Sequence, residues 1–271
     1  MRDSLYEQIP FRLSELEHRY GPNIHLVGNP LLLSQLAKLC AKGVVQPEIN
    51  RLVSVLYVDL VEIVLNAEFP RKLAAVPTRM IESTPQGIYQ GEVIDPDVRA
   101  ISVNIARAGT LPSQITYDLL NHILSPQLVR QDHIVMSRML DSAEHVIGSA
   151  IGGSKIGGDV DDAFLLFPDP MGATGGSLST AISLYKERVP GMPRRIICLN
   201  LIVTPEYLRR ITRDHPEAKI YALRLDRGLS PEDVFDTVPG THWDREKGLN
   251  DKQYIVPGGG GFGELMNNAF V

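Results

Sequence analysis

The stretch from Phe164 to Ser179, FLLFPDPMGATGGSLS, constrains the fold of this chain more than any other. An apolar run leads into Asp169 and then into a turn that is rich in glycine around Thr174. A run of helix-compatible residues follows from Leu178 to Arg188. Short apolar runs are typical of buried strands, and helices often begin after small polar residues. The stretch therefore predicts a buried strand, a glycine-rich loop and the first turn of a helix.

Such a loop is a good place to bind a phosphate. Unpaired backbone N–H groups at the start of a helix point along the positive end of its dipole, so no lysine is needed. Small residues let the backbone approach the anion, and the hydroxyls of Thr174 and Ser177 can add hydrogen bonds. Asp169 lies at the carboxyl end of the predicted strand, where open α/β sheets bind their ligands. An acid in this position indicates a sugar hydroxyl or a magnesium-bound group as its partner.

Other interpretations of the loop fit the residues less well. A P-loop requires a lysine followed by serine or threonine, and a dinucleotide-binding turn requires a GxGxxG pattern; the loop has neither. A purely structural turn with a serine cap is the remaining alternative, because serine and glycine are common where helices begin. The seven histidines show no spacing typical of metal ligands, so no structural metal is predicted.

Length and composition describe an ordinary globular protein. The chain has 271 residues, 44% hydrophobic and 22% charged, which is enough for one large α/β domain or two small ones. A formal net charge of −5 argues against broad binding to nucleic acid or anionic membranes. The start of the chain, MRDSLYEQIP, has no apolar signal core, and Cys40 and Cys198 lie in apolar surroundings. These features predict a cytoplasmic protein with reduced thiols.

Residues 1–97 are predicted to form N-terminal helices and a hairpin. The most apolar segment, 52–65, contains Asp59 and Glu62, which favours a buried amphipathic helix over a membrane span. This helix is expected to pack partly against another subunit. The predicted elements are helices at 11–20, 31–42 and 46–69, a strand at 24–27, and a hairpin that pairs 79–82 with 88–93 around the turn at 84–87.

Residues 98–227 alternate between strands and helices, which predicts a mostly parallel sheet with helices on both faces. The glycine-rich segment 142–162 has no clear periodicity and is interpreted as a mobile lid over the phosphate site, with an ordinary surface loop as the alternative. Residues 228–253 are irregular and receive no role. The strands expected beside 164–168 are 100–105, 133–137, 195–203 and 219–225, and the helices are 111–124, 178–188 and 205–214.

The loop DPMGATGGS resembles the loop that binds phosphoribosyl diphosphate (PRPP) in phosphoribosyltransferases, and most of all the form DPMxATGGS of uracil phosphoribosyltransferases. Pro168, a non-acidic residue before Asp169, also fits that family. Further motifs follow the family's order from about residue 100 to 270. They are Arg107-Ala108-Gly109, Arg138 after the strand HIVMS, Lys155, Thr204-Pro205-Glu206, His215-Pro216 and Tyr254-Ile255-Val256-Pro257-Gly258.

The resemblance implies a fold, a reaction and a set of site residues. The fold is that of type I phosphoribosyltransferases, here one domain over 1–271 with N-terminal helices and a hairpin (1–97), a PRPP-binding core (98–227), and a C-terminal hood (228–271). The reaction is transfer of phosphoribosyl from PRPP to uracil, which gives UMP and diphosphate in pyrimidine salvage. PRPP would bring Mg²⁺ with it, without direct protein ligands, and the protein would be a homodimer or larger homo-oligomer.

The implied roles cover three segments. Asp169, Arg107 and Arg138 would be catalytic, and Lys155 would belong to a flexible loop. The implied PRPP ligands are Arg107, Ala108, Gly109, Arg138, Asp169, Pro170, Met171, Gly172, Ala173, Thr174, Gly175, Gly176, Ser177 and Gly261. The implied uracil-binding residues are Ile255, Gly260, Gly261 and Phe262.

Several positions depart from the family pattern. Gly261 stands where the family has an aspartate that contacts PRPP, and Leu265 replaces an arginine. Gly172 replaces a leucine, and Thr110-Leu111-Pro112 replaces the usual LGM. Two alternatives to uracil transfer follow from the missing acid. One is a regulatory protein of transferase-like fold that senses PRPP or a nucleotide, and the other is a phosphoribosyltransferase for a different base.

Overall fold

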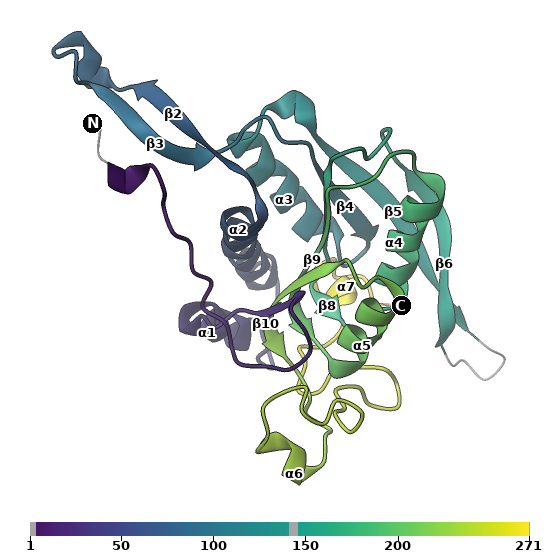
Figure 1. Cartoon of the computed structure of the whole chain (residues 1–271). Helices are drawn as coiled ribbons and strands as arrows, with labels where there is room; N and C mark the ends of the chain where they lie inside the picture. The colour runs from purple at the N-terminus through teal and green to yellow at the C-terminus, as the bar shows by residue number, and fades with distance from the viewer. Residues whose placement is uncertain (1–3, 141–145, 271) are drawn as a thin grey trace.

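The computed structural model describes residues 4–140 and 146–270, and its centre is a largely parallel sheet (Figure 1). Its strands are β1 Ile24–Leu26, β4 Ala100–Ala106, β5 Val129–Leu140, β6 Val146–Lys155, β7 Phe164–Pro168, β8 Met171–Gly172, β9 Arg195–Val203 and β10 Lys219–Leu225. They lie in the order β1-β10-β9-β7-β4-β5-β6, with β8 paired to β9. Only the pairing of β5 with β6 is antiparallel among these described strands, so the predicted α/β fold is confirmed.

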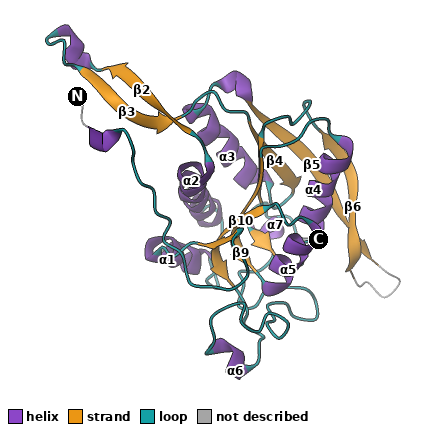
Figure 2. Ribbon diagram, in the orientation of Figure 1, coloured by secondary structure: helices purple, strands orange, loops and turns teal. Residues whose placement is uncertain are grey.

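Helices cover both faces of the sheet (Figures 1 and 2). One apolar cluster joins the sheet to α1 Pro30–Leu39, α2 Glu48–Glu68 and α3 Thr110–Ile123. A second cluster on the other face joins it to α4 Gly176–Arg188 and α5 Pro205–Asp214. The helices predicted from the sequence between 110 and 214 are all present, because their apolar residues recur at helical spacing and face one of these clusters.

Helix α2 is amphipathic and packs on the sheet. Its buried residues follow the spacing of one helix face and are Ile49, Leu52, Val53, Leu56, Tyr57, Leu60, Val61, Val64 and Leu65. The Tyr57 hydroxyl donates a 3.1 Å hydrogen bond to the main-chain oxygen of Leu199 in β9. The apolar face of α2 is therefore buried within this chain. Across the described ranges, no helix is both long enough and apolar enough to span a membrane.

The predicted helix at 11–20 is wrong. This segment is extended and runs antiparallel beside β1, where the Leu16 amide donates a 2.9 Å hydrogen bond to the Leu26 oxygen and Glu15 bridges Val27. Its apolar spacing instead sends Tyr20, 4% exposed, into the core. Because the backbone partner is an edge strand, the helical pattern was overridden by a pairing that local sequence cannot reveal.

The hairpin also differs from the prediction. Strand β2 Arg71–Pro77 pairs with β3 Ile88–Ile94, and the predicted first strand, 79–82, is a short 3₁₀ helix at the tip, η2 Arg79–Glu82. The Thr78 hydroxyl accepts a 3.2 Å hydrogen bond from the Met80 amide and so starts the turn. Pro77 has no N–H with which to extend the ladder. The hairpin projects from the body of the molecule (Figure 1).

The segment interpreted as a lid belongs mostly to the sheet. Residues 141–145 lie outside the described part of the chain, and Val146–Lys155 is the edge strand β6. It pairs with β5 from Leu140↔Val146 to His133↔Lys155, with irregular register near Val135. The predicted strand 133–137 is therefore the middle of a longer strand. Most residues of β6, VIGSAIGGSK, are small, so the strand shows no alternation of apolar and polar residues in the sequence.

The C-terminal part wraps over one end of the sheet and contains α6 Glu232–Phe235 and α7 Phe262–Leu265. The Glu246 carboxylate is fully buried and forms a 3.0 Å ion pair with Arg227. The Tyr20 hydroxyl donates to the same carboxylate. Trp243 donates a 3.0 Å hydrogen bond to the Pro205 oxygen at the start of α5. Residues 228–253 are thus fastened to the body by buried polar contacts. Short 3₁₀ turns at Ser4–Tyr6 and Pro126–Leu128 complete the described elements.

Candidate active site

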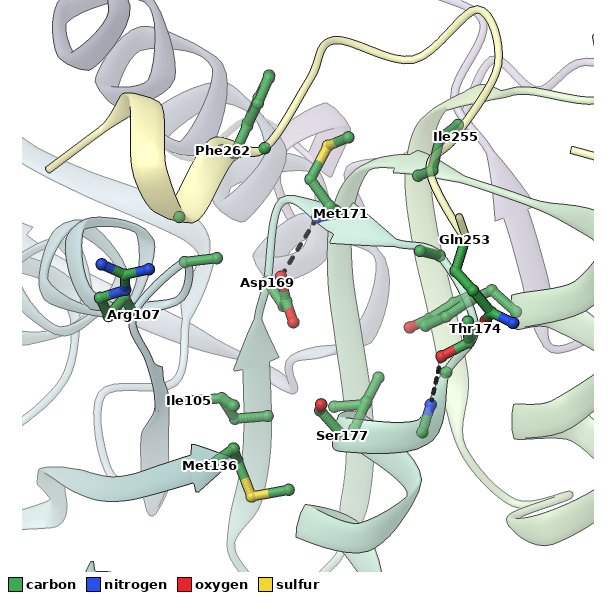
Figure 3. A pocket seen from close by; sticks show the side chains of 18 of the residues that line it. Ile105, Arg107, Met136, Asp169, Met171, Thr174, Ser177, Gln253, Ile255 and Phe262 are labelled. Atoms are coloured by element: carbon green, nitrogen blue, oxygen red, sulfur yellow. Dashed lines mark hydrogen bonds between the residues drawn. The ribbon is translucent and has the colours of Figure 1, made fainter. Parts of the chain in front are cut away.

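A cavity of about 520 Å³ opens at the carboxyl ends of β4 and β7 (Figure 3). Three segments that are far apart in sequence line it: the turn after β4, the glycine-rich loop after β7, and the C-terminal loop. Of the residues predicted as PRPP or uracil ligands, the lining includes Arg107, Ala108, Asp169, Met171, Ala173, Thr174, Gly175, Gly176, Ser177, Ile255, Gly260, Gly261 and Phe262. The segments that the sequence singled out therefore meet around one space.

The loop after β7 has the predicted strand-turn-helix form, with one correction. Helix α4 begins at Gly176, and its N-cap is Gly175 in the left-handed conformation, φ 75°, so Ser177 does not cap it. The Thr174 hydroxyl accepts a 3.3 Å hydrogen bond from the Gly176 amide. A left-handed N-cap strongly favours glycine. The first-turn residues Gly176, Ser177 and Leu178 of α4 line the cavity, where an anion site at a helix start is expected.

Three buried side chains hold this loop in place, and the sequence analysis named only one of them, Thr204. Asn200 donates a 2.6 Å hydrogen bond to the Asp169 oxygen, and Thr204 donates one of 2.6 Å to the Ala173 oxygen. Tyr207 donates a 2.8 Å bond to Asn200. Only Thr204 carries a recognisable signal, because a threonine before Pro205-Glu206 is typical of a helix cap.

Tyr207, one of these three side chains, also explains the glycine at position 172. A Cβ at this position would lie 3.0 Å from atoms of the Tyr207 ring, closer than such contacts normally come. The ring of Tyr207 therefore fills the space where the family carries a leucine side chain. The loop is packed, although it lacks the usual apolar residue.

Asp169 lies in the floor of the cavity at the end of β7 (Figure 3). Its Oδ1 accepts a 3.3 Å hydrogen bond from the Met171 amide. Desolvation raises the pKa of the carboxyl to about 6, and the Met171 hydrogen bond acts weakly in the other direction. The carboxylate is thus ionised at neutral pH and can accept a further hydrogen bond.

The turn after β4 brings Arg107 to the rim. The Ala106–Arg107 peptide bond is cis, and the exposed Arg107 side chain donates a 3.0 Å hydrogen bond to the Ala269 oxygen. Gly109 precedes α3, where a Cβ would lie 2.8 Å from the Ile105 oxygen. The turn therefore needs glycine at this position, and Gly109 shapes the site without lining the cavity.

The C-terminal loop forms a wall of the cavity next to the Arg107 turn. The Gly258 amide donates a 2.7 Å hydrogen bond to the Asp226 carboxylate, and Arg224 donates 2.9 Å to the Gly258 oxygen. Phe262 is 2% exposed, and Figure 3 shows its ring directed away from Asp169. Its main chain lines the cavity while the ring belongs to the core, so stacking of a base on the Phe262 ring is not supported.

The described lining of the cavity differs from the predicted set of site residues. Arg138 lies in β5 opposite Ser149, and its side chain is outside the described part of the structure. Lys155 is exposed at the end of β6 and is not among the lining residues. The cavity instead includes Ile105, Met136 and Gln253, which the sequence did not single out (Figure 3).

No group of three or more His, Cys, Asp or Glu side chains within 4–140 and 146–270 is arranged to hold a metal ion. The cavity does contain the carboxylates of Asp169 and Glu264. Magnesium prefers oxygen ligands and usually keeps several waters while it binds substrate phosphates. This donor set fits an ion that arrives with a phosphorylated substrate.

Comparisons with known proteins agree with the geometry. A family model described as uracil phosphoribosyltransferase matches residues 27–243. The uracil phosphoribosyltransferase of Dictyoglomus turgidum is 30% identical over 243 residues, which cover 89% of this chain and 97% of that protein. That of Caldanaerobacter subterraneus subsp. tengcongensis is 36% identical over 112 residues, which cover 41% of this chain and 42% of that protein. The alignment with this second relative thus spans less than half of its length.

A solved structure, that of the AQ2163 protein from Aquifex aeolicus, has the same fold. It matches with a TM-score of 0.67 at 21% sequence identity and covers 92% of this chain and 99% of that one. The family match spans most of the chain, and the alignment with the Dictyoglomus protein spans nearly all of that relative. The predicted resemblance is confirmed, and the chain belongs to the uracil phosphoribosyltransferase family.

Proposed function

We propose that this chain transfers the phosphoribosyl group of PRPP to uracil and forms UMP and diphosphate. The observation that carries the proposal is the single cavity lined by the glycine-rich loop, the Arg107 turn and the Ile255–Phe262 loop. A phosphate cradle, a cation at the rim and a wall of main-chain groups are the parts that this reaction needs. Membership of the family supports the same activity.

The glycine-rich loop would bind the 5′-phosphate of PRPP. The amides of the first turn of α4 and the hydroxyls of Thr174 and Ser177 lie at its mouth. Hydrogen bonds from main-chain N–H groups hold an anion without a mobile counter-ion, so the ribose is positioned firmly. Asp169 would accept a hydrogen bond from a ribose hydroxyl on the same side.

In the reaction, the bond between C1 of the ribose and a diphosphate oxygen breaks, and a bond from N1 of uracil to C1 forms. The proton of N1 is released and the bonding electrons leave with the diphosphate. Positive charge develops on the ribose ring in the transition state, and the ionised Asp169 stabilises it electrostatically. Arg107 and Arg138 would neutralise charge on the leaving diphosphate.

Magnesium bound to the diphosphate would withdraw charge from the leaving group. Asp169 and Glu264 are the cavity carboxylates that could contact such an ion or its waters. In the C-terminal loop, main-chain groups of Ile255, Gly260, Gly261 and Phe262 would bind the edge of uracil. Main-chain recognition needs no particular side chain, which is compatible with the departures from the family motif.

A homo-oligomer in the cytoplasm is part of the same proposal. The β2–β3 hairpin extends away from the body (Figure 1). Its strands and tip expose apolar side chains. These are Leu73 at 64%, Val76 at 48%, Met80 at 58% and Ile81 at 39% exposed. A second copy of the chain would cover them. Light scattering after size-exclusion chromatography measures the molar mass of the assembly and so tests this directly. A monomer at micromolar concentration would contradict this part.

A panel of bases tests whether uracil is the base that accepts the phosphoribosyl group. Purified protein is incubated with PRPP, Mg²⁺ and one of uracil, thymine, cytosine, adenine or hypoxanthine, and nucleotides are separated by chromatography. The proposal predicts UMP from uracil and far less product from the other bases. Product from another base alone would make the chain a transferase for that base. PRPP binding without any product would favour the regulatory alternative.

A further inference from the structure

Gln253 lines the cavity in a backbone conformation that favours glycine. Its φ is 64°, in the left-handed region. This conformation costs a residue with a Cβ about 1–2 kcal/mol. Non-glycine residues that are held in this way cluster at functional sites, where the surrounding structure fixes them. A role for the side chain would explain why a glutamine stands at this position.

Asn250 holds the backbone of Gln253 in place. Its side-chain oxygen accepts hydrogen bonds of 3.0 and 2.9 Å from the amides of Lys252 and Tyr254. Its main-chain oxygen accepts one of 2.8 Å from the Gln253 amide, and its own amide donates one of 3.0 Å to the Tyr254 oxygen. These hydrogen bonds close the turn from Asn250 to Tyr254, so the backbone fixes the point from which the Gln253 side chain extends.

The Gln253 side chain extends toward the glycine-rich loop (Figure 3). Its amide group is directed toward Thr174, which also lines the cavity. Among the residues that the structure describes, none forms a hydrogen bond or ion pair with this side-chain amide. A carboxamide carries two N–H donors. Both donors can therefore bind a ligand in the cavity.

A phosphate at the start of α4 would leave oxygens for a second donor group. Residues 174–177 line the cavity on the side of the glycine-rich loop, and their N–H and hydroxyl groups would bind the oxygens that face this loop. A terminal phosphate has three strong acceptor oxygens. Those that face away from the loop would meet the C-terminal segment, from which Gln253 extends.

We propose that Gln253 donates a hydrogen bond from its side-chain amide to the 5′-phosphate of PRPP and of UMP. This proposal rests on the proposed function, which places that phosphate in the glycine-rich loop. Gln253 lies two residues before Ile255, whose main chain would bind uracil. One segment would thus contact both the phosphate and the base, and a bound phosphate would hold that segment against the loop.

Calorimetry with UMP tests the contact, and Gln253→Ala is the first variant. Alanine removes the amide and keeps the Cβ, so the backbone strain stays the same. UMP affinity should fall about tenfold, equivalent to about 1.4 kcal/mol, the scale of one hydrogen bond to a charged group. Affinity for uridine, which has the base and the ribose but no phosphate, should be unchanged.

Two further variants separate a phosphate contact from a structural role. Gln253→Glu keeps the shape of the side chain and replaces its donor by a negative charge, so it should bind UMP more weakly than Gln253→Ala. Gln253→Gly removes the amide and relieves the left-handed strain. It should bind UMP no more tightly than the alanine variant, while its melting temperature should be at least as high.

Gln127→Glu is the matched control. Gln127 is exposed and precedes β5, at the end of the sheet opposite to the cavity. The same added charge at this distance should leave UMP affinity unchanged.

Unchanged UMP affinity in Gln253→Ala, with UMP formed by the wild type, would remove this role from Gln253 and leave the proposed function standing. Equal losses of affinity for UMP and uridine would place the side chain at the ribose or the base and would also contradict the phosphate contact. A wild type that binds neither PRPP nor UMP would overturn the proposed function together with this inference.

Discussion

The hydroxyl of Tyr207 lies 2.8 Å from the side-chain oxygen of Asn200, to which it donates a hydrogen bond. Asn200 in turn donates a 2.6 Å bond to the main-chain oxygen of Asp169. Tyr207 is 1% and Asn200 0% exposed. This buried chain of contacts links helix α5 to the acid in the cavity floor, so packing behind the loop controls the position of Asp169.

Replacing Tyr207 with phenylalanine should weaken both fold and site. It leaves the buried Asn200 oxygen without its donor, which costs about 1–3 kcal/mol in unfolding free energy. Without the hydrogen bond from Tyr207, Asn200 holds Asp169 less firmly, so the KM for PRPP should rise. Urea unfolding and steady-state kinetics measure the two effects. Tyr117→Phe on α3 is the control and should stay within about 0.5 kcal/mol of the wild type. Equal effects of the two changes would contradict the account.

Asp169→Asn should remove activity and raise stability at neutral pH. Desolvation raises the pKa of this carboxyl from 3.8 to about 6, so the folded state binds the proton more tightly than the unfolded state. Stability contributed by the group is therefore present at low pH and falls as pH rises from about 4 to 6. Asparagine avoids that loss, which amounts to at most about 3 kcal/mol above pH 6.

The pH dependence separates this account from a merely structural role. The difference in melting temperature between Asp169→Asn and the wild type should be near zero at about pH 4 and reach a plateau above about pH 7. Wild-type activity should fall as pH drops through about 6, because the protonated acid no longer stabilises positive charge. An Asn variant that is less stable than the wild type at pH 8 would refute this view of Asp169.

Gly175→Ala should destabilise the loop by about 1–2 kcal/mol, because this position needs a left-handed backbone. Its φ is 75°, and a Cβ would also lie 3.4 Å from the Tyr207 ring and from Arg210. Relief of this strain would turn the first amides of α4, so PRPP affinity should fall as well. Gly153→Ala in β6, where a Cβ meets nothing within 4 Å, is the matched control. Calorimetric titration with PRPP measures the affinity of both variants. Unchanged affinity in Gly175→Ala would exclude the predicted anion site.

Glu246→Gln should loosen residues 228–253. The carboxylate is fully buried and pairs with Arg227 at 3.0 Å, and its loss leaves a buried guanidinium without a counter-charge. Removing one partner of a buried pair typically costs about 3–5 kcal/mol. Trp243, the single tryptophan, lies 4.9 Å from the Tyr20 ring, so its fluorescence reports this region. Glu232→Gln on the exposed face of α6 should leave both stability and fluorescence unchanged. A wild-type unfolding midpoint in Glu246→Gln would count against the buried pair as the anchor.

The sequence predicted the core well because its signals there are local. Apart from β6 and the short β8, each strand and helix between 98 and 227 shows its own sequence pattern, and the DPMGATGGS loop carries its own turn chemistry. The segment 11–20 was predicted wrongly because it pairs with β1. Nothing in the apolar pattern of 11–20 indicates that pairing. The hairpin register was missed because no hydrophobic repeat marks it. Pro77 and Thr78 decide where the ladder ends.

The parts of the site that sequence could not reveal depend on contacts between distant segments. Asn200 and Tyr207 are ordinary core residues by pattern, and only their place behind Asp169 gives them a role.

The proposed reaction transfers a phosphoribosyl group from PRPP to uracil in this cavity. The most direct measurement follows UMP and diphosphate together, by chromatography and a phosphate-coupled assay, after uracil is added to the protein with PRPP and Mg²⁺. Equal amounts of the two products are expected from the wild type, and neither product from Asp169→Asn. Diphosphate or phosphate released without UMP, or PRPP that is bound and never consumed, would contradict it.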